Sequence, residues 1–226
     1  MINKFKKMFS VLIALSFILC AVSSASAKGI VTLRTFWDEA SQTYKIGSKA
    51  DFLGHNWTLW KADDTYLYVI TTDSLRKSIF SNDEVVYADS EVRRVVNGYE
   101  NEMKNYSGGG NSATDTLTWS IINGGDANYI ANSPTTEDGV GTDHLYLLSY
   151  SDAHFLKDSA DPDKNAICKT GYNWWLRTAR RSGSALRIYN IYSDGKLIDD
   201  HAWFTRGVRP ALKINLASPM LSAVRF

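Results

Sequence analysis

Three short runs rich in aromatic and aliphatic residues in the last third of the chain constrain the fold most strongly. They cover residues 174–177, 186–192 and 208–216, and glycines and the pair Asp194-Gly195 separate them. Runs of this length and composition are typical of β-strands, and Asp-Gly between two of them indicates a tight hairpin turn. We therefore expect a strand-rich, antiparallel C-terminal third.

The N-terminal half carries the same strand pattern. Residues 57–61 and 66–71 are rich in aromatic and β-branched side chains, and an acidic turn separates them. This arrangement predicts a second hairpin. Further strands are expected at 30–36 and 116–122, and the apolar run 145–148 is expected to form a buried strand.

Helical patterns lie between these strands. The strongest begins after Ser90, a good N-cap, where apolar residues recur at spacings of three and four and form one apolar face. These residues are Val92, Val95, Val96, Tyr99 and Met103. The pair Asn97-Gly98 is expected to interrupt this helix.

Two shorter helices are also expected. Asp73 and Ser74 could cap one that extends to residue 80, and Ser151-Asp152 could cap another that extends to residue 156. Strands at both ends of the chain with helices between them predict an α+β fold class.

The first 27 residues have the features of an export signal. Three lysines precede an apolar run of about 15 residues, and Ala25-Ser26-Ala27 supplies the small residues that signal peptidase requires. A membrane-spanning helix needs roughly 20 apolar residues. We expect cleavage before Lys28, a mature domain over 28–226 with no membrane span, and a secreted or cell-surface location; a retained N-terminal anchor is the alternative.

Charge and cysteine content narrow the possible functions. The sequence has 25 Lys and Arg against 24 Asp and Glu, and loss of three lysines with the signal leaves a net charge near −2. Nucleic-acid partners are disfavoured, since they require many cationic contacts. Cys168 is the single cysteine after residue 27, so the mature chain cannot form an internal disulfide. A buried thiol is favoured over intermolecular pairing.

Two ordered motifs resemble the DUF6273 domains of secreted bacterial proteins. They are Trp-Trp-Leu-Arg at 174–177 and Gly-Val-Arg-Pro-Ala-Leu at 207–212. The segments 91–97 and 145–153 are similar to upstream parts of that family. The resemblance covers about residues 57–216.

This resemblance implies a C-type-lectin-like fold, related to formylglycine-generating enzymes and to bacterial and phage receptor-binding proteins. Such a fold pairs N- and C-terminal strands and presents long irregular loops. The enzymes of that group use two active-site cysteines, whereas the mature chain has Cys168 alone. The calcium and sugar motifs of animal lectins are also missing. The resemblance therefore implies a scaffold without either chemistry.

Four residues within the two motifs are assigned structural roles. Arg177 and Arg209 are expected to be buried and to bind loop carbonyl groups, with ligand contact as the alternative. Gly207 and Pro210 complete the structural set.

Candidate ligand-binding residues are aromatic or cationic side chains on the C-terminal strands. Trp174 and Trp175 should point to opposite faces of a strand. Either both rings are covered or the outward ring is a stacking platform for a sugar or peptide. Tyr, Trp and Arg are frequent at binding hot spots, and they guide the choice of the other candidates. These candidates are Arg180, Arg181, Tyr189, Tyr192, His201, Trp203 and Arg206. Ordinary alternation between core and solvent is the competing interpretation.

A weak calcium candidate lies at Asp161, Asp163 and Asn165, which place oxygen atoms at alternate positions. Ala166 stands where a calcium loop needs glycine, and Tyr172 where it needs a carboxylate, so a solvated turn is favoured. The four histidines lack metal-ligand spacing, and no cofactor is indicated.

The leading hypothesis is a secreted, non-catalytic binding or adhesion domain that recognises a glycan or a surface protein. Loops and the C-terminal hairpins would make the contacts. The alternatives are a degenerate relative of formylglycine-generating enzymes with an unknown activity and a structural domain of a surface protein. An exposed Cys168 beside a histidine would favour an enzyme, and outward aromatic side chains gathered on one concave face would favour binding.

Overall fold

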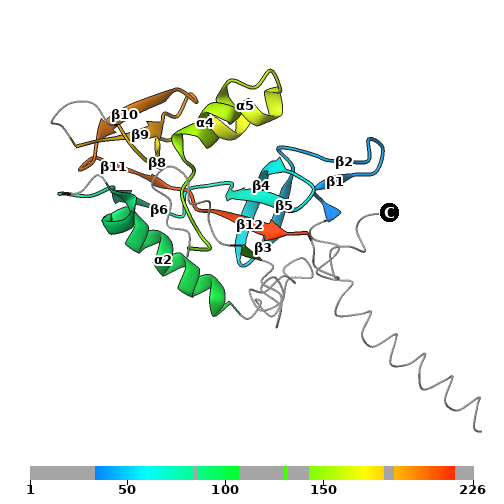
Figure 1. Cartoon of the computed structure of the whole chain (residues 1–226), viewed down its shortest axis with the longest axis horizontal. Coiled ribbons are helices and arrows are strands. Elements are labelled where there is room, and N and C mark those ends of the chain that lie inside the picture. Colours follow the sequence, from blue (N-terminus) through cyan, green and yellow to red (C-terminus); the bar gives the residue numbers. More distant parts are fainter. Residues whose placement is uncertain (1–33, 84–85, 107–129, 132–142, 181–185, 217–226) are drawn as a thin grey trace, which may run out of the picture.

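Two five-stranded sheets and one two-stranded ribbon form the framework of the protein in its computed structural model (Figure 1). The structure describes residues 34–83, 86–106, 130–131, 143–180 and 186–216. Within these ranges every strand pair is antiparallel except β8 with β11. Together with three short helices this gives a mixed α+β architecture, as expected.

The first sheet joins the N-terminal strands to the last strand, in the order β3-β4-β5-β12-β7. Its strands are β3 (Lys49–Phe52), β4 (His55–Ala62), β5 (Tyr66–Thr71), β7 (Ile130–Ala131) and β12 (Ala211–Asn215). The predicted hairpin of 57–61 with 66–71 is confirmed as β4–β5. β12 pairs with β5 from Ala211↔Ile70 to Asn215↔Tyr66.

The second sheet has the order β10-β9-β8-β11-β6. Its strands are β6 (Arg76–Ile79), β8 (Trp174–Ala179), β9 (Arg187–Ile191), β10 (Leu197–His201) and β11 (Thr205–Val208). The hairpin predicted at Asp194-Gly195 is confirmed between β9 and β10. Gly195 has φ +87°, a conformation in which glycine avoids the strain of a side chain.

The predicted helix after Ser74 is wrong, because this segment forms β6 and pairs with β11. The Ser74 hydroxyl donates to the Arg76 carbonyl at 2.7 Å and accepts from the Val208 amide at 2.9 Å. Its hydrogen bonds are therefore made to β6 and β11, and it does not cap a helix. Tertiary pairing therefore overrides the local capping pattern.

The single strand predicted over 208–216 is also wrong. It divides at Arg209-Pro210 into β11 and β12, which belong to different sheets. The predicted strand 145–148 is buried but makes only one isolated bridge, from Tyr146 to Ala211. Residues 34–36 are not in a strand, while 30–33 and the predicted strand 116–122 lie outside the described residues.

The three helices start at polar caps. α2 (Glu91–Lys104) begins after Ser90, as predicted, and runs through Asn97-Gly98 without interruption. α4 (Tyr150–Lys157) begins after Ser149 rather than at Ser151, because Ser149 and Asp152 form a reciprocal capping box. α5 (Pro162–Cys168) follows Asp161, and a 3₁₀ turn η1 (Tyr87–Asp89) precedes α2.

Buried side chains form two clusters, one on each side of the central strands. Val96 of α2 belongs to the first cluster, and Leu156 of α4 belongs to the second. Figure 1 shows α2 on one side of the β11–β12 run and the α4–α5 pair on the other. Residues 145–148 alternate between the clusters, since Leu147 enters the first and Leu148 the second.

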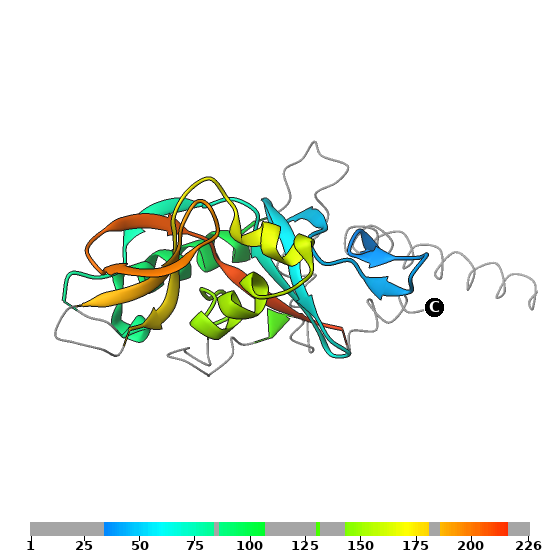
Figure 2. The same ribbon diagram turned by 90° about the horizontal axis from the view of Figure 1, so that it is seen from above.

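The ribbon of β1 (Trp37–Asp38) and β2 (Thr43–Tyr44) lies at the opposite end of the molecule from the β10–β11 connection (Figures 1 and 2). None of the helices in the described residues is long and apolar enough to cross a bilayer.

Candidate functional site

The two tryptophans of β8 are both fully buried, which corrects their assignment as ligand-binding residues. Trp174 belongs to the cluster beneath α4 and α5, and Trp175 belongs to the cluster beneath α2. They do point to opposite faces, but each face of the strand is covered. Neither ring is therefore available as an outward stacking platform.

The motif arginines are equally buried and bind main-chain carbonyl groups. Arg177 Nη1 donates to the Leu147 carbonyl at 2.5 Å. Arg209 Nε and Nη1 donate to the carbonyls of Thr71 at 3.0 Å and Ile167 at 2.9 Å. Burial lowers the pKa of Arg209 to about 10. These contacts fasten three separate segments to the central strands.

The other two motif positions are restricted by their neighbours. A Cβ on Gly207 would lie 2.8 Å from Ser74 Oγ and 3.0 Å from the Tyr172 ring. The Pro210 carbonyl accepts from the Thr71 amide at 2.9 Å, which holds the crossing between the two sheets.

Several predicted candidates meet where β10 connects to β11. The His201 ring stacks on Trp203 with centroids 4.2 Å apart and planes 17° apart, and Phe204 meets His201 edge-on at 5.6 Å. Trp203 and Phe204 are 47% and 39% exposed. The Arg206 guanidinium lies 5.1 Å from the Phe204 ring centroid. We call His201, Trp203, Phe204 and Arg206 the β10–β11 surface.

Ion pairs offset most of the positive charge around this surface. Arg206 Nη2 lies 2.7 Å from Asp200 Oδ2, and both Arg180 and Arg187 bind the Asp199 carboxylate. Partial burial alone would raise the pKa of Asp199, but the two guanidinium groups outweigh it and lower that pKa. The patch is thus aromatic and close to neutral, rather than strongly cationic.

The remaining predicted candidates lie elsewhere. The Tyr189 ring packs 4.4 Å from that of Tyr150 at the start of α4, so it is part of the helix–sheet contact. Tyr192 is half-buried at the β9–β10 turn, and Arg181 lies outside the described residues. The structure therefore brings together His201, Trp203 and Arg206, while Phe204 joins them without having been predicted.

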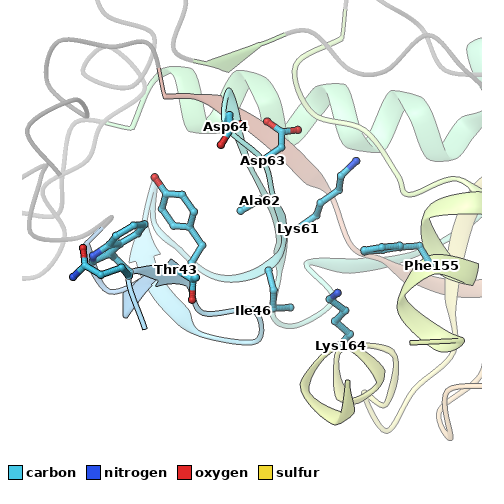
Figure 3. Close-up of a pocket in the computed structure, with 11 residues that line it drawn as sticks. Thr43, Ile46, Lys61, Ala62, Asp63, Asp64, Phe155 and Lys164 are labelled. Atoms are coloured by element: carbon cyan, nitrogen blue, oxygen red, sulfur yellow. The ribbon is translucent and has the colours of Figure 1, made fainter. Parts of the chain in front are cut away.

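A groove that sequence reasoning missed lies at the other end of the molecule, with a volume of about 610 Å³ (Figure 3). The β1–β2 ribbon, the β4–β5 turn and the helices α4 and α5 contribute to it. Its lining residues are Trp37, Gln42, Thr43, Tyr44, Ile46, Lys61, Ala62, Asp63, Asp64, Phe155 and Lys164. In Figure 3, Phe155 and Lys164 approach from the helices and Thr43 from the ribbon.

Aromatic contacts hold the walls of this groove. Trp37 and Tyr44 pack edge-to-face across the ribbon with centroids 4.9 Å apart. Phe155 is 45% exposed, and Lys164 Nζ lies 4.7 Å from its ring centroid. No local sequence pattern indicates the groove, because Trp37 and Tyr44 lie far from Phe155 in the chain.

The Asp63 carboxylate fixes the β4–β5 turn at the edge of the groove. It accepts from the amides of Thr65 at 2.8 Å and Tyr66 at 2.7 Å and from the Tyr68 hydroxyl at 2.9 Å. Partial burial alone would raise the pKa of Asp63, but these hydrogen bonds lower it. This edge of the groove is accordingly preorganised.

The calcium candidate forms the start of α5 instead of a solvated turn. The Asp161 side chain caps the helix by accepting from the main-chain amide of Asp163 at 2.9 Å, and Asn165 Nδ2 donates to the Lys157 carbonyl at 3.1 Å. Across the described ranges, no three His, Cys, Asp or Glu side chains gather closely enough to hold a metal ion. Cys168 is buried, and burial raises the pKa of its thiol to about 11.

Comparison with known proteins identifies the domain. No curated protein and no solved structure matches the chain. The sequence pattern of one family, described as a domain of unknown function (DUF6273), matches residues 68–216, about two thirds of the chain. This range begins within β5 and ends just after β12, so it contains the whole second sheet and both buried arginines. The chain therefore belongs to the DUF6273 family.

Proposed function

We propose that this protein is an exported, non-catalytic binding domain that attaches to a surface protein through its β10–β11 surface. The observation that carries the proposal is the pair of exposed rings Trp203 and Phe204 at one connection between strands. Tryptophan and arginine are the residues that most often dominate protein-binding energy. Exposed aromatic side chains grouped in this way indicate a binding role more strongly than scattered ones.

The rigidity of this surface supports binding. His201 stacks on Trp203, and Arg206 is fixed by Asp200 while it contacts Phe204. Side chains that are already ordered lose less conformational entropy when a partner binds, so more of the contact energy appears as affinity. Because the described arginines around this surface are each paired with a carboxylate, an apolar contact is favoured over an electrostatic one.

Two further features support the other parts of the proposal. The basic, apolar and small-residue regions of the first 27 residues support export. Cys168 supports a non-catalytic role, since a buried thiol with a raised pKa is a poor nucleophile at neutral pH. The proposal includes a C-type-lectin-like fold, and the pairing of the last strand, β12, with β5 from the N-terminal half supports it.

The test uses residues 28–226 and an array of purified cell-surface and extracellular-matrix proteins. Any protein that binds is then titrated by biolayer interferometry against the wild type, the double variant Trp203→Ala/Phe204→Ala and the control Phe155→Ala. Phe155 is similarly exposed but belongs to the groove at the other end.

We expect the double variant to weaken binding by about tenfold or more, and the control to bind within about twofold of wild type. The melting temperature of each variant shows whether it is folded. Binding that the double variant leaves unchanged, or the absence of any binding protein on the array, would contradict the proposal.

A further inference from the structure

We propose that the groove between the β1–β2 ribbon and the helices α4 and α5 is a binding site for a neutral oligosaccharide. Its position separates it from the β10–β11 surface, because the two lie at opposite ends of the molecule (Figures 1 and 2). The inference therefore stands or fails independently of the proposed attachment to a protein.

Aromatic rings on both sides of the groove match the apolar face of a pyranose ring. One side presents the ring pair Trp37 and Tyr44, and the helices present Phe155. A pyranose carries C–H groups on its faces and hydroxyls around its rim. Aromatic surfaces pack against the C–H groups, and polar side chains bind the hydroxyl groups. Large rings with few rotatable bonds also provide contact area at low entropic cost.

The charges of the groove favour a neutral ligand. Lys61 and Lys164 contribute two positive charges, and Asp63 and Asp64 contribute two negative charges, so the lining has no net charge. A phosphate or sulfate ligand would meet both carboxylates as well as the ammonium groups. Hydroxyl groups, in contrast, can donate to a carboxylate and accept from an ammonium group.

The polar groups retain capacity for such a ligand. Asp63 accepts three hydrogen bonds within its own turn, and a carboxylate offers about four lone-pair sites. Lys61 Nζ lies 4.7 Å from the Tyr68 ring centroid, a contact with the ring face that leaves its N–H donors available. A volume of about 610 Å³ also lies within the usual range of small-ligand sites.

The turn of the ribbon has a defined backbone geometry. Gln42 adopts φ +54°, a left-handed conformation that is uncommon for a residue other than glycine. Its side-chain amide donates to the Glu39 carbonyl at 2.8 Å, which holds the turn closed. Gln42 itself lines the groove, so this contact orders one part of the groove edge.

Most of the groove lies outside the region shared with the family. All its lining residues except Phe155 and Lys164 precede residue 68, where the family match begins. The ribbon and β4 thus contribute most of the groove lining, and the matched region contributes Phe155 and Lys164.

The experiment is isothermal titration calorimetry of residues 28–226 with neutral hexasaccharides of glucose, mannose, xylose and N-acetylglucosamine, and with an oligogalacturonate as the anionic comparison. We expect at least one neutral hexasaccharide to bind with Kd between about 10 μM and about 1 mM. Phe155→Ala and Trp37→Ala should each weaken it by about tenfold, while Trp203→Ala should stay within about twofold.

Phe155→Ala keeps the test decisive if loss of Trp37 unfolds the ribbon, because Phe155 projects from a helix surface and is 45% exposed. Three outcomes would overturn the proposal. They are no binding of any neutral hexasaccharide up to about 10 mM, a clear preference for the oligogalacturonate, and sugar binding that Phe155→Ala leaves unchanged.

Discussion

Glu100 joins α2 to the buried segment 143–148, and its replacement by glutamine tests how this junction is stabilised. Glu100 Oε1 lies 2.6 Å from Lys104 Nζ and 3.0 Å from His144 Nδ1. Its Oε2 accepts from the amides of His144 and Leu145, both at 3.2 Å. The carboxylate is almost completely buried. Glutamine keeps one carbonyl oxygen for the two main-chain amides, but its amino group cannot accept a hydrogen bond from Lys104 and carries no charge to attract it.

The pKa of Glu100 gives the expected size of the change in the free energy of unfolding. Burial alone would raise this pKa, but the hydrogen bonds from His144, Lys104 and the Leu145 amide hold it at about 2, below the ordinary 4.5. At 1.36 kcal/mol per unit, this difference corresponds to at most about 3 kcal/mol of stability. Lys104 is 40% exposed, so water screens part of the attraction, and we expect about 1–3 kcal/mol.

The direction of the shift fixes the pH dependence. Because the folded-state pKa is below the unfolded one, the stabilisation is fully present above pH 4.5 and is lost as the pH falls toward 2. More than about half of it should be lost by pH 3. Glu100→Gln should therefore cost about 1–3 kcal/mol at pH 7, and the gap to wild type should narrow in acid.

The assay is urea unfolding of residues 28–226 across this pH range, followed by circular dichroism. Glu102→Gln is the matched control, because Glu102 lies on the same helix and is exposed. Its effect should be close to zero at every pH. An equal loss for Glu100→Gln at pH 7 and pH 3, or an equal effect of the control, would refute this account.

Three further predictions concern the packing around single residues. Gly207→Ala should lower the free energy of unfolding by about 1–3 kcal/mol, because its Cβ would overlap Ser74 and Tyr172. Gly98→Ala should instead raise the free energy of unfolding by about 0.5–1 kcal/mol, because nothing lies within 4 Å of a Cβ at this position in the middle of α2. Urea titration measures both, and a stabilising Gly207→Ala would contradict the close approach. The Cys168 thiol should react with Ellman's reagent at pH 7 only after denaturation, because it is buried and its pKa is about 11. Rapid reaction of the native protein would show that the site is open.

Local patterns in the sequence predicted the elements that short-range contacts determine. The β4–β5 and β9–β10 hairpins and α2 follow from alternation, turn residues and an N-cap. The segment after Ser74 could not be assigned in this way, because its strand exists only through pairing with β11.

The candidate site was likewise predicted only where residue type or local alternation was sufficient. Trp203 and Arg206 were found from residue type, and alternation placed Trp174 and Trp175 on opposite faces. Alternation cannot show that both faces of β8 are covered, because α2 and the α4–α5 pair come from other parts of the chain. The groove was missed for the same reason, since it forms only where the ribbon meets α4 and α5.

The division of the C-terminal run into β11 and β12 has a mechanical consequence. One continuous stretch of chain contributes a strand to each sheet, and the buried Arg209 at the crossing binds the carbonyls of Thr71 in β5 and Ile167 in α5. Neither sheet can open without pulling on the other, so the region is expected to unfold as a single cooperative unit. The amides of β8, β11 and β12 should then exchange with solvent only through global unfolding, as the slowest-exchanging group in the molecule.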